Sequence, residues 1–364
     1  MKPGYIKPDY FMDRQNRKNR ILPAEWESQD AVLLAWPHKE TDWEPMLQET
    51  RDCFRKIIDT ITRFEDVVLL VDDNDQNPSS RFRFPERLQI VKVPVNDTWA
   101  RDFGPLLVKE NRKYIAVDFK FNGWGLKFAA DKDNLITQRL FENRIFSQDV
   151  VRENRLNFVL EGGSIESDGK GTVLTTSRCL LSPNRNGRYS KNEIEDRLKQ
   201  FLGANNILWL ENGYLAGDDT DSHIDTLARF CDPGTIVYIK TDNPEDEHFE
   251  ALNKMENQLR KFKTTEGKSY NLIPLPMADP VYHNNQRLPA TYANFLIINH
   301  AVLVPFYNSP KDIEAKKIFE KIFPNREVIG IDCRPLIKQN GSLHCVTMQL
   351  PQGSLKKQVR RLIR

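Results

Sequence analysis

Short runs of apolar residues rich in Val, Ile and Leu recur from one end of the chain to the other, and segments with helical periodicity separate them. Such runs, bounded by Asp, Asn, Gly and Pro, are typical of buried strands. Strands that alternate with single helices over the whole length predict an α/β fold. The expected strands cover residues 31–36, 67–71, 88–93, 114–119, 172–175, 207–210, 235–239, 295–298 and 301–305, and the expected helices cover residues 46–63, 133–142, 191–202, 246–262 and 312–322.

The order strand, strand, helix, strand returns about every 60 to 70 residues, which indicates a repeated unit. No Gly/Ser-rich linker divides the chain, and the polar stretch 72–80 is typical of a loop inside a domain. We therefore expect a single domain over residues 1–364, with residues 1–20 as a polar N-terminal extension. The basic segment 355–364 is expected to form a solvated surface.

Composition excludes several functional classes. The 53 Lys and Arg side chains nearly balance the 51 Asp and Glu side chains, so bulk charge does not favour nucleic acid as a partner. The five cysteines are scattered without a C-x-x-C pair, which argues against a disulfide scaffold and a structural zinc site. The N-terminus does not resemble a signal peptide, and no apolar stretch is long enough to span a bilayer. We expect a cytoplasmic protein with no membrane partner.

Segment 96–105 (NDTWARDFGP) directly follows an expected strand, and α/β folds place their sites at strand ends. Trp99, Arg101 and Asp102 are its candidate ligand-binding residues. Taken alone, the segment is explained more simply as a surface turn with a local ion pair.

Segment 160–164 (LEGGS) places Glu161 after an apolar run and before two glycines. Glycines at such a position let the backbone approach another group closely. The alternative is a β-bulge with an exposed glutamate.

Segment 217–225 (GDDTDSHID) is rich in carboxylates. His223 and Asp225 are two residues apart, so on a strand they would face the same side and could transfer protons. A metal site is the alternative, because Asp218, Asp219 and Asp221 add oxygen ligands. The segment lacks the glycine and glutamate that an EF-hand loop requires.

Cys345 lies between a glycine turn and an apolar strand. A cysteine at such a junction, with His and carboxylates elsewhere in the chain, is a candidate nucleophile. The other cysteines are expected to be small core side chains. They are Cys53, Cys179, Cys231 and Cys333.

Together the four segments offer a thiol, an imidazole and three carboxylates. Carboxylates suit a guanidinium ion, which is planar, cationic and rich in N–H donors. Its central carbon is a poor electrophile, so a thiolate assisted by a general acid is a suitable reagent to attack it.

These motifs resemble those of the guanidine-modifying enzymes of the pentein superfamily, and most closely the agmatine deiminase and bacterial-type peptidylarginine deiminase family. The resemblance begins at PAEWESQDAVLLAWP (residues 23–37), passes through the four segments in the family's order, and ends near Pro351. It implies a five-bladed, pseudo-symmetric α/β propeller of ββαβ units with the site in a central channel.

The resemblance also implies a role for each site residue. Asp102 and Asp225 would grip the two sides of the guanidinium. His223 would be the general acid and base, Glu161 would line the site, and Cys345 would be the nucleophile. We further expect contacts with the substrate from Trp99, Arg101, Asn294 and Asp219.

The implied activity is the hydrolysis of agmatine to N-carbamoylputrescine and ammonia, a reaction of polyamine biosynthesis, through a covalent thiouronium on cysteine. It requires no metal and no organic cofactor. Deimination of peptidyl arginine or free arginine is the alternative, because Ser222, Thr226 and residues 340–342 depart from the family pattern near the site. A metal-dependent hydrolase and a non-catalytic guanidino-binding protein are further alternatives, and Cys345 argues against both. The sequence leaves open whether the chain forms a homo-oligomer.

Overall fold

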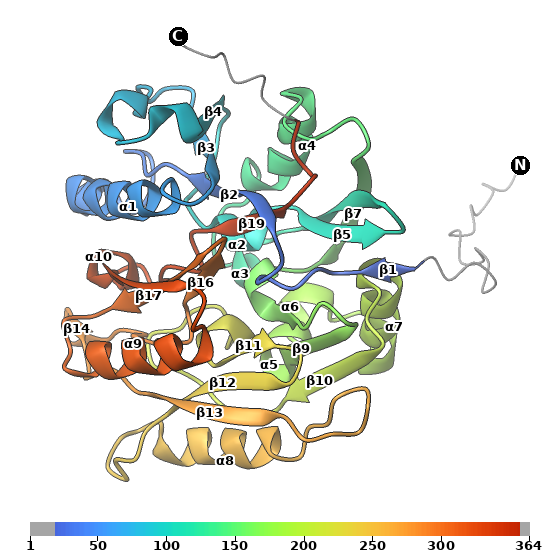
Figure 1. Ribbon diagram of the computed structural model, residues 1–364, viewed down its shortest axis with the longest axis vertical. Coiled ribbons are helices and arrows are strands. Elements are labelled where there is room, and N and C mark those ends of the chain that lie inside the picture. Colours follow the sequence, from blue (N-terminus) through green and yellow to red (C-terminus); the bar gives the residue numbers. More distant parts are fainter. Residues whose placement is uncertain (1–18, 357–364) are drawn as a thin grey trace, which may run out of the picture.

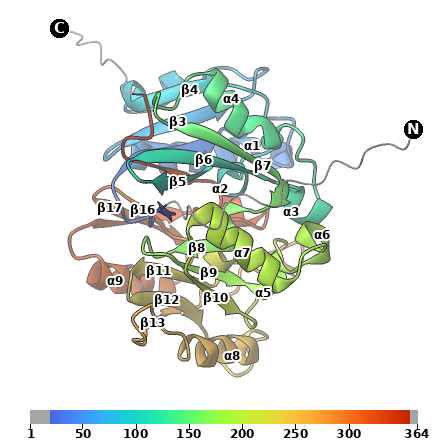
Figure 2. The same cartoon turned by 90° about the vertical axis from the view of Figure 1, so that its right-hand side faces the viewer.

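The computed structural model describes residues 19–356. Within them the strands form five sheets of three or four strands and one two-stranded hairpin. Figure 1 shows the five sheets arranged around the centre of the molecule, with the longer helices at the periphery. Figure 2 shows the same arrangement from the side, with β4 (Leu88–Lys92) near the top and β13 (Asn271–Pro276) toward the bottom. The predicted α/β class is confirmed.

One unit recurs in the five sheets. A first strand pairs antiparallel with a second, and a helix then leads to a third strand that pairs parallel with the second. An example runs from β11 (Ala228–Asp232) and β12 (Thr235–Lys240) through α8 (Phe249–Leu259) to β13 (Asn271–Pro276). Three other units are β5 (Leu106–Glu110), β6 (Lys113–Lys120), α4 (Ile136–Glu142) and β7 (Val151–Val159); β8 (Ile165–Ser167), β9 (Thr172–Thr176), α7 (Lys191–Leu202) and β10 (Asn206–Leu210); and β16 (Leu296–Ile298), β17 (Ala301–Phe306), α9 (Lys311–Ile322) and β18 (Glu327–Asp332).

The fifth unit joins the two ends of the described chain. Strand β19 (Met348–Pro351) pairs antiparallel with β2 (Gln29–Ala35), and Met348 lies opposite Leu33. The last strand therefore completes a sheet whose other strands come from the N-terminal part. The remaining elements of this unit are α1 (Leu47–Ile61), β3 (Asp66–Val71) and the additional strand β4 (Leu88–Lys92).

The shorter elements connect or extend these units. Strand β1 (Arg20–Ile21) pairs with β5, and β14 (Tyr282–His283) forms a hairpin with β15 (Gln286–Arg287). The short helices are α2 (Ala100–Phe103), α3 (Gly123–Leu126), α5 (Ser177–Leu180), α6 (Pro183–Asn186) and α10 (Arg334–Ile337).

Burial explains the two kinds of sequence pattern. Strand β3 lies between β2 and β4 and is apolar in a continuous run, as expected for a parallel strand covered on both faces. Helix α1 instead buries Phe54, Ile57 and Ile61 on one face, and each such side chain contributes about 1.5–3 kcal/mol to folding.

The ends of α7 follow local rules that the sequence predicts. Ser190 and Glu193 form a capping box at its N-terminus, in which each side chain accepts a hydrogen bond from the other residue's backbone. The helix ends at Gly203, whose φ of 73° lies in the left-handed region.

The predicted helices and strands are all present, with ends that differ by a few residues. Arg20 was expected in the N-terminal extension, but it pairs in β1. The rest of that extension, residues 1–18, and the basic residues 357–364 lie outside the described residues. Within residues 19–356, none of the helices has both the length and the apolar character needed to cross a bilayer.

Candidate active site

Polar residues from the five connections between successive units meet at one place. Helix α2 follows β4 and packs against the 3-10 turn η5 (Gly162–Ser164), which follows β7. The turn η5 in turn packs against η6 (Ile224–Thr226), which precedes β11. The residues delivered in this way are Asp102, Glu161, His223, Asp225, Asn294 and Cys345.

Asp102 lies in α2 and is buried. Its Oδ1 accepts a hydrogen bond from the backbone N–H of Gly163 at 2.9 Å, and its Oδ2 accepts one from Nε1 of Trp124 at 2.9 Å. Burial raises the pKa of Asp102, although the neighbouring His223 opposes this shift. Its two hydrogen-bond donors are neutral groups, and its ion-pair partner is His223, 3.7 Å away.

His223 stands between two carboxylates. Its Nδ1 lies 3.7 Å from Oδ1 of Asp102, and its Nε2 lies 3.7 Å from Oε2 of Glu161. Burial alone would lower the pKa of His223, but Asp102, Cys179 and Glu161 together raise it well above its ordinary value. The two carboxylates thus favour the imidazolium form, which can act as a general acid.

Glu161 is fully buried, which contradicts the alternative of an exposed glutamate on a bulge. Both of its carboxylate oxygens accept hydrogen bonds from Nε of Arg185, at 3.0 and 2.9 Å. Burial opposes ionisation, but His223 and Arg185 hold the pKa of Glu161 below its ordinary value. The thiol of Cys179 also lies 3.7 Å from Oε2 of Glu161, so this predicted core cysteine borders the site.

Asp225 lies in η6 and is fully buried. Its Oδ2 is 2.7 Å from Nδ1 of His344. Burial opposes ionisation, but the hydrogen bond and charge of His344 lower the pKa of Asp225. We had expected His223 and Asp225 to share one side of a strand. They lie instead on a 3-10 turn, from which His223 reaches Asp102 and Asp225 reaches His344.

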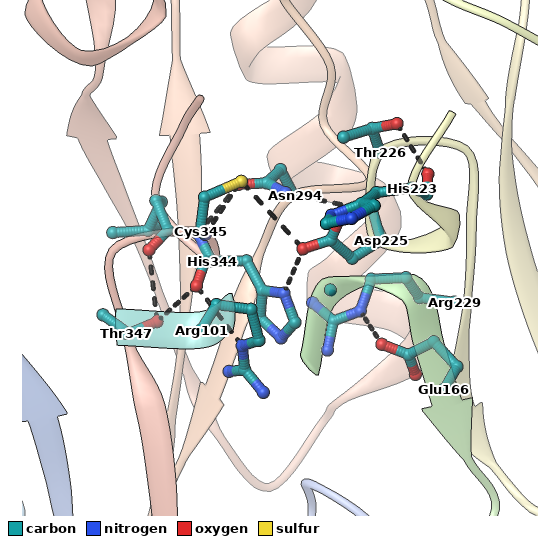
Figure 3. Close-up of polar contacts among 12 residues, drawn as sticks. Arg101, Glu166, His223, Asp225, Thr226, Arg229, Asn294, His344, Cys345 and Thr347 are labelled. Atoms are coloured by element: carbon teal, nitrogen blue, oxygen red, sulfur yellow. Dashed lines mark hydrogen bonds and ion pairs between the residues drawn. The ribbon is translucent and has the colours of Figure 1, made fainter. Parts of the chain in front are cut away.

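Cys345 lies in the turn before β19 and faces Asn294 and Asp225 (Figure 3). Its Sγ is 3.4 Å from Oδ1 of Asn294 and 4.0 Å from Oδ2 of Asp225. Burial and the carboxylates of Asp225 and Asp102 raise the pKa of the Cys345 thiol well above its ordinary value. In this arrangement the thiol form is favoured, because the sulfur is buried and lies 4.0 Å from the carboxylate of Asp225.

Asn294 orients the loop that carries the nucleophile. Its Oδ1 accepts hydrogen bonds from the backbone N–H groups of His344 and Cys345, at 2.8 and 3.4 Å. Its Nδ2 donates to the carbonyl oxygen of Asp225 at 3.4 Å. The predicted polar residue is therefore in the site, where it joins the Cys345 turn to the Asp225 turn.

Arg101 is placed differently from the other predicted residues. Its guanidinium donates to Oε1 of Gln349 at 2.6 Å and to Oε2 of Glu25 at 3.3 Å. Its Nε donates to the carbonyl oxygen of His344 at 3.4 Å. These contacts join α2 to the Cys345 turn and to the start of β2, and Figure 3 shows Arg101 on the side of His344 away from His223.

Trp99 is buried between two other indole rings, with ring centroids 5.5 Å from Trp43 and 6.4 Å from Trp124. Its ring also covers Gly341, where a Cβ atom would lie only 2.0 Å from the ring. Trp99 therefore packs against Trp124, which donates a hydrogen bond to Asp102, and against the turn that leads to Cys345.

The acidic residues before His223 have separate partners. Asp218 caps the turn, because its Oδ2 accepts from the N–H of Ser222 at 2.6 Å. Asp221 forms ion pairs with Arg185 and Lys127. Asp219 accepts a hydrogen bond from Nδ2 of Asn340 at 3.2 Å, and its backbone carbonyl accepts one from Lys127. Burial together with Asp218 raises its pKa to about 6, although Asn340 and Lys127 oppose this shift.

These acids do not assemble the metal site that the sequence left open. Among residues 19–356, one group of three or more potential ligands has its donor atoms within 4.8 Å of one another, namely Glu161, Cys179 and His223. Of the expected ligands in segment 217–225, only His223 belongs to this group.

Sequence reasoning missed several residues that shape the site. Trp124 donates to Asp102 from a backbone with φ of 54°, a rare conformation for a bulky residue, and it lies between Gly123 and Gly125. The Gly-Trp-Gly sequence was the signal that could have revealed it. Glu25 and Arg229 were also missed, because their partners are far away in the sequence.

Comparisons with known proteins show the family to which the chain belongs. Residues 21–351 match the Porphyromonas-type peptidyl-arginine deiminase family. A relative from Latilactobacillus sakei, named "Putative agmatine deiminase", is 33% identical over 357 residues, which cover 91% of this chain and 96% of the relative.

Two solved structures are similar over nearly the whole chain. The "Putative Arginine Deiminase from Porphyromonas gingivalis" is 51% identical with a TM-score of 0.89, and the match covers 93% of this chain and 100% of that chain. An agmatine deiminase of C. jejuni with substrate bound is 39% identical with a TM-score of 0.85, and the match covers 92% of this chain and 97% of that chain. The chain belongs to the Porphyromonas-type peptidyl-arginine deiminase family.

Proposed function

We propose that this protein deiminates a guanidinium group and that its substrate is agmatine, which it hydrolyses to N-carbamoylputrescine and ammonia. One observation carries the proposal. The buried thiol of Cys345 lies 4.0 Å from the carboxylate of Asp225, and the buried carboxylate of Asp102 is close enough for its charge to act on the same thiol. A flat cation with several N–H donors is the ligand that such a pair of carboxylates binds best.

Substrate binding would activate the nucleophile. Without substrate, burial and the negative charges of Asp225 and Asp102 raise the pKa of the Cys345 thiol. A guanidinium bound between these carboxylates adds a positive charge beside the sulfur, and a nearby positive charge favours a thiolate. On substrate binding the thiol would release its proton to solvent, so the reactive thiolate would arise only when a substrate is present.

In the first half of the reaction, the thiolate attacks the guanidinium carbon and forms a C–S bond. The C–N bond to the terminal nitrogen then breaks, and this nitrogen takes a proton from His223 and leaves as ammonia. The product of this half is a thiouronium covalently attached to Cys345. The raised pKa of His223 keeps the required proton available.

In the second half, neutral His223 takes a proton from a water molecule that attacks the same carbon. The C–S bond breaks with its electron pair going to sulfur, and the proton of the added hydroxyl group passes to that sulfur, so the ureido product is released and Cys345 returns to its thiol form. Glu161 holds the imidazole from the side opposite Asp102. We assign Asn294 and Arg101 the positioning of the Cys345 turn, because their contacts are with that turn.

The choice of agmatine rests on the relatives. The C. jejuni and L. sakei proteins carry the name agmatine deiminase, whereas the P. gingivalis structure is named as an arginine deiminase. In this chain, the carboxylate of Asp219 accepts a hydrogen bond from the neutral Asn340, whereas Asp218 caps the turn and Asp221 pairs with Arg185. We infer that Asp219 attracts the distal ammonium of agmatine and repels the carboxylate of free arginine.

The test is release of ammonia from agmatine, free arginine and an arginyl peptide, measured side by side as kcat/KM. Agmatine should give the highest value. If kcat/KM were higher for the peptide or for free arginine, that compound and not agmatine would be assigned as the substrate. If none of the three compounds released ammonia, the assignment as a deiminase would be refuted. A chelator should leave the rate unchanged, because the proposed mechanism uses neither metal nor cofactor.

Three broader properties belong to the same proposal. We propose that residues 1–364 act as one catalytic domain, that the reaction takes place in the cytoplasm, and that it serves polyamine formation. Size-exclusion chromatography with light scattering would decide whether the working unit is a homo-oligomer.

A further inference from the structure

His344, the residue before the nucleophile, is held between two carboxylates. Its Nδ1 lies 2.7 Å from Oδ2 of Asp225, and its Nε2 lies 2.6 Å from Oε2 of Glu25. The side chain is almost completely buried. Figure 3 shows its ring turned toward Asp225 and lying between Arg101 and Arg229.

Both ring nitrogens must donate in this arrangement. An ionised carboxylate only accepts hydrogen bonds, and both nitrogens of histidine are donors only in the imidazolium form. Burial opposes ionisation of both acids, yet nearby positive groups lower the pKa of Asp225 and lower that of Glu25 well below its ordinary value. The geometry at both ring nitrogens, with a carboxylate oxygen 2.7 Å away on one side and 2.6 Å away on the other, is therefore the one that an imidazolium satisfies.

Glu25 is itself fixed from several directions. Its Oε2 also lies 3.0 Å from Nη2 of Arg229 and 3.3 Å from Nη2 of Arg101. Its Oε1 accepts a hydrogen bond from the N–H of Ile297 at 2.7 Å. Glu166 completes the surrounding charges through its ion pair with Arg229. Nε2 of His344 is thus bonded to a carboxylate whose orientation is fixed by its other contacts.

At the near end, Asp225 uses only one of its oxygens for His344. Its Oδ1 is buried and has no hydrogen-bond partner among the described residues. A carboxylate held by one oxygen in a fixed direction presents its other lone pairs in a fixed direction as well. Such preorganisation is what bidentate recognition of a guanidinium requires.

We propose that His344 is a positioning residue, which keeps Asp225 ionised and correctly oriented for the guanidinium, with Glu25 as the counter-ion that balances the charge of the imidazolium. This inference rests on the proposed function, because it assigns a role within the same clamp. Without Glu25, a cation beside Asp225 would cancel part of the attraction for a cationic substrate. Glu25 removes that penalty and leaves the hydrogen bond in place.

Two substitutions separate the two ends of the imidazole. In His344→Asn, the side-chain amide takes the position of Nδ1 and can still donate to Asp225. In His344→Gln, the amide takes the position of Nε2, so it can donate to Glu25 and leaves Asp225 without its donor. Both variants replace the imidazole with a neutral side-chain amide, and they differ only in which ring nitrogen the amide replaces. Each variant is therefore the matched control of the other.

The two variants should differ in KM and in pH dependence. Loss of a charge-assisted hydrogen bond to a buried carboxylate weakens binding by that carboxylate by about tenfold or more. We therefore expect KM for agmatine to be about tenfold higher in His344→Gln than in His344→Asn. Without its donor, the pKa of Asp225 rises, so the acid limb of kcat/KM should move to higher pH in His344→Gln. A residue that merely fills space would affect both variants equally and leave the pH profile in place.

The proposal is overturned if the two variants have equal KM and equal acid limbs, or if His344→Gln is the better enzyme. Calorimetric binding of agmatine to Cys345→Ala, with and without His344→Gln, gives the same comparison without turnover. A third variant, Glu25→Gln, should weaken this binding because the imidazolium loses its counter-ion, and unchanged binding would contradict the counter-ion role. If the wild-type protein releases no ammonia from any guanidino substrate, the proposed function fails, and that result is distinct from equal behaviour of the variants.

Discussion

The backbone N–H of Gly163 donates a hydrogen bond of 2.9 Å to Oδ1 of Asp102, and no side chain fits between them. A Cβ atom at Gly163 would lie 2.7 Å from Nδ1 of His223, 2.9 Å from Oδ1 of Asp102 and 3.1 Å from Oδ2 of Asp225. This one glycine therefore touches the general acid and both arms of the clamp. The second glycine of the Glu-Gly-Gly motif is explained by the closeness of the site and not by backbone conformation.

Gly163→Ala should reduce kcat/KM by about a hundredfold or more, because displacing catalytic groups by about 1 Å has effects of that size. Gly234→Ala is the matched control, since the nearest atom to its Cβ would be 3.6 Å away. Steady-state kinetics of both variants checks the prediction. An active Gly163→Ala enzyme would show that the three groups do not act together.

Cys345→Ala should abolish turnover and still bind agmatine, because the clamp carboxylates remain. Cys53→Ala should retain activity, since Cys53 lies on α1 and its thiol contacts the carbonyl oxygen of Asp332. Ammonia release measures the first property and calorimetry the second. Turnover by Cys345→Ala would rule out the covalent mechanism.

Asp102→Asn and Asp225→Asn should each cost about 2–5 kcal/mol of transition-state stabilisation, because each removes a buried charge that faces the cation. Asp196→Asn is the control, since its side chain is 77% exposed on α7. The measure is kcat/KM for agmatine. A loss of less than about tenfold, or about 1.4 kcal/mol, in Asp102→Asn would contradict its role in the clamp.

KM for agmatine should rise as the pH falls through about 6. The pKa of Asp219 is raised to about 6, so above this pH its carboxylate is charged and attracts the ammonium, and below it the carboxyl is neutral and the attraction is lost. Asp219→Asn should remove this dependence. Butylguanidine lacks the ammonium, so its KM should not depend on pH in this way with the wild-type protein or with Asp219→Asn. If KM rose in parallel for agmatine and butylguanidine, the titrating group would be a residue other than Asp219.

The sequence predicted those elements whose burial gives a continuous apolar run or a clear helical face, such as β3 and α1. It missed β7, whose residues Val151–Val159 are mostly polar and half-buried, and β13, where Pro274 and Pro276 argue against a strand. It also missed β11, which carries the buried Arg229. A charged side chain in a core strand becomes reasonable only when Glu166 and Glu25 are seen beside it.

Local sequence motifs predicted which residues belong to the site, but they did not predict the direction in which each side chain points. Arg101 and Asp102 are adjacent in sequence, yet Asp102 contacts Trp124 and Gly163 while Arg101 contacts Glu25. The direction of each side chain is set by partners that come from other units of the fold. For the same reason the role of Glu25, 320 positions before Cys345 in the numbering, could not be seen in the pattern around either residue.

Strand β19 pairs with β2 and follows directly after the turn of Cys345, so the order of synthesis has a chemical consequence. A growing chain that has reached residue 340 already contains both clamp aspartates, but β2 still has an unpaired edge and no nucleophile exists. The same short stretch then covers that edge and brings the thiol into the centre. The same stretch carries His344 and Cys345, so a chain cut short before residue 340 would lack both the nucleophile and the residue that we propose orients Asp225.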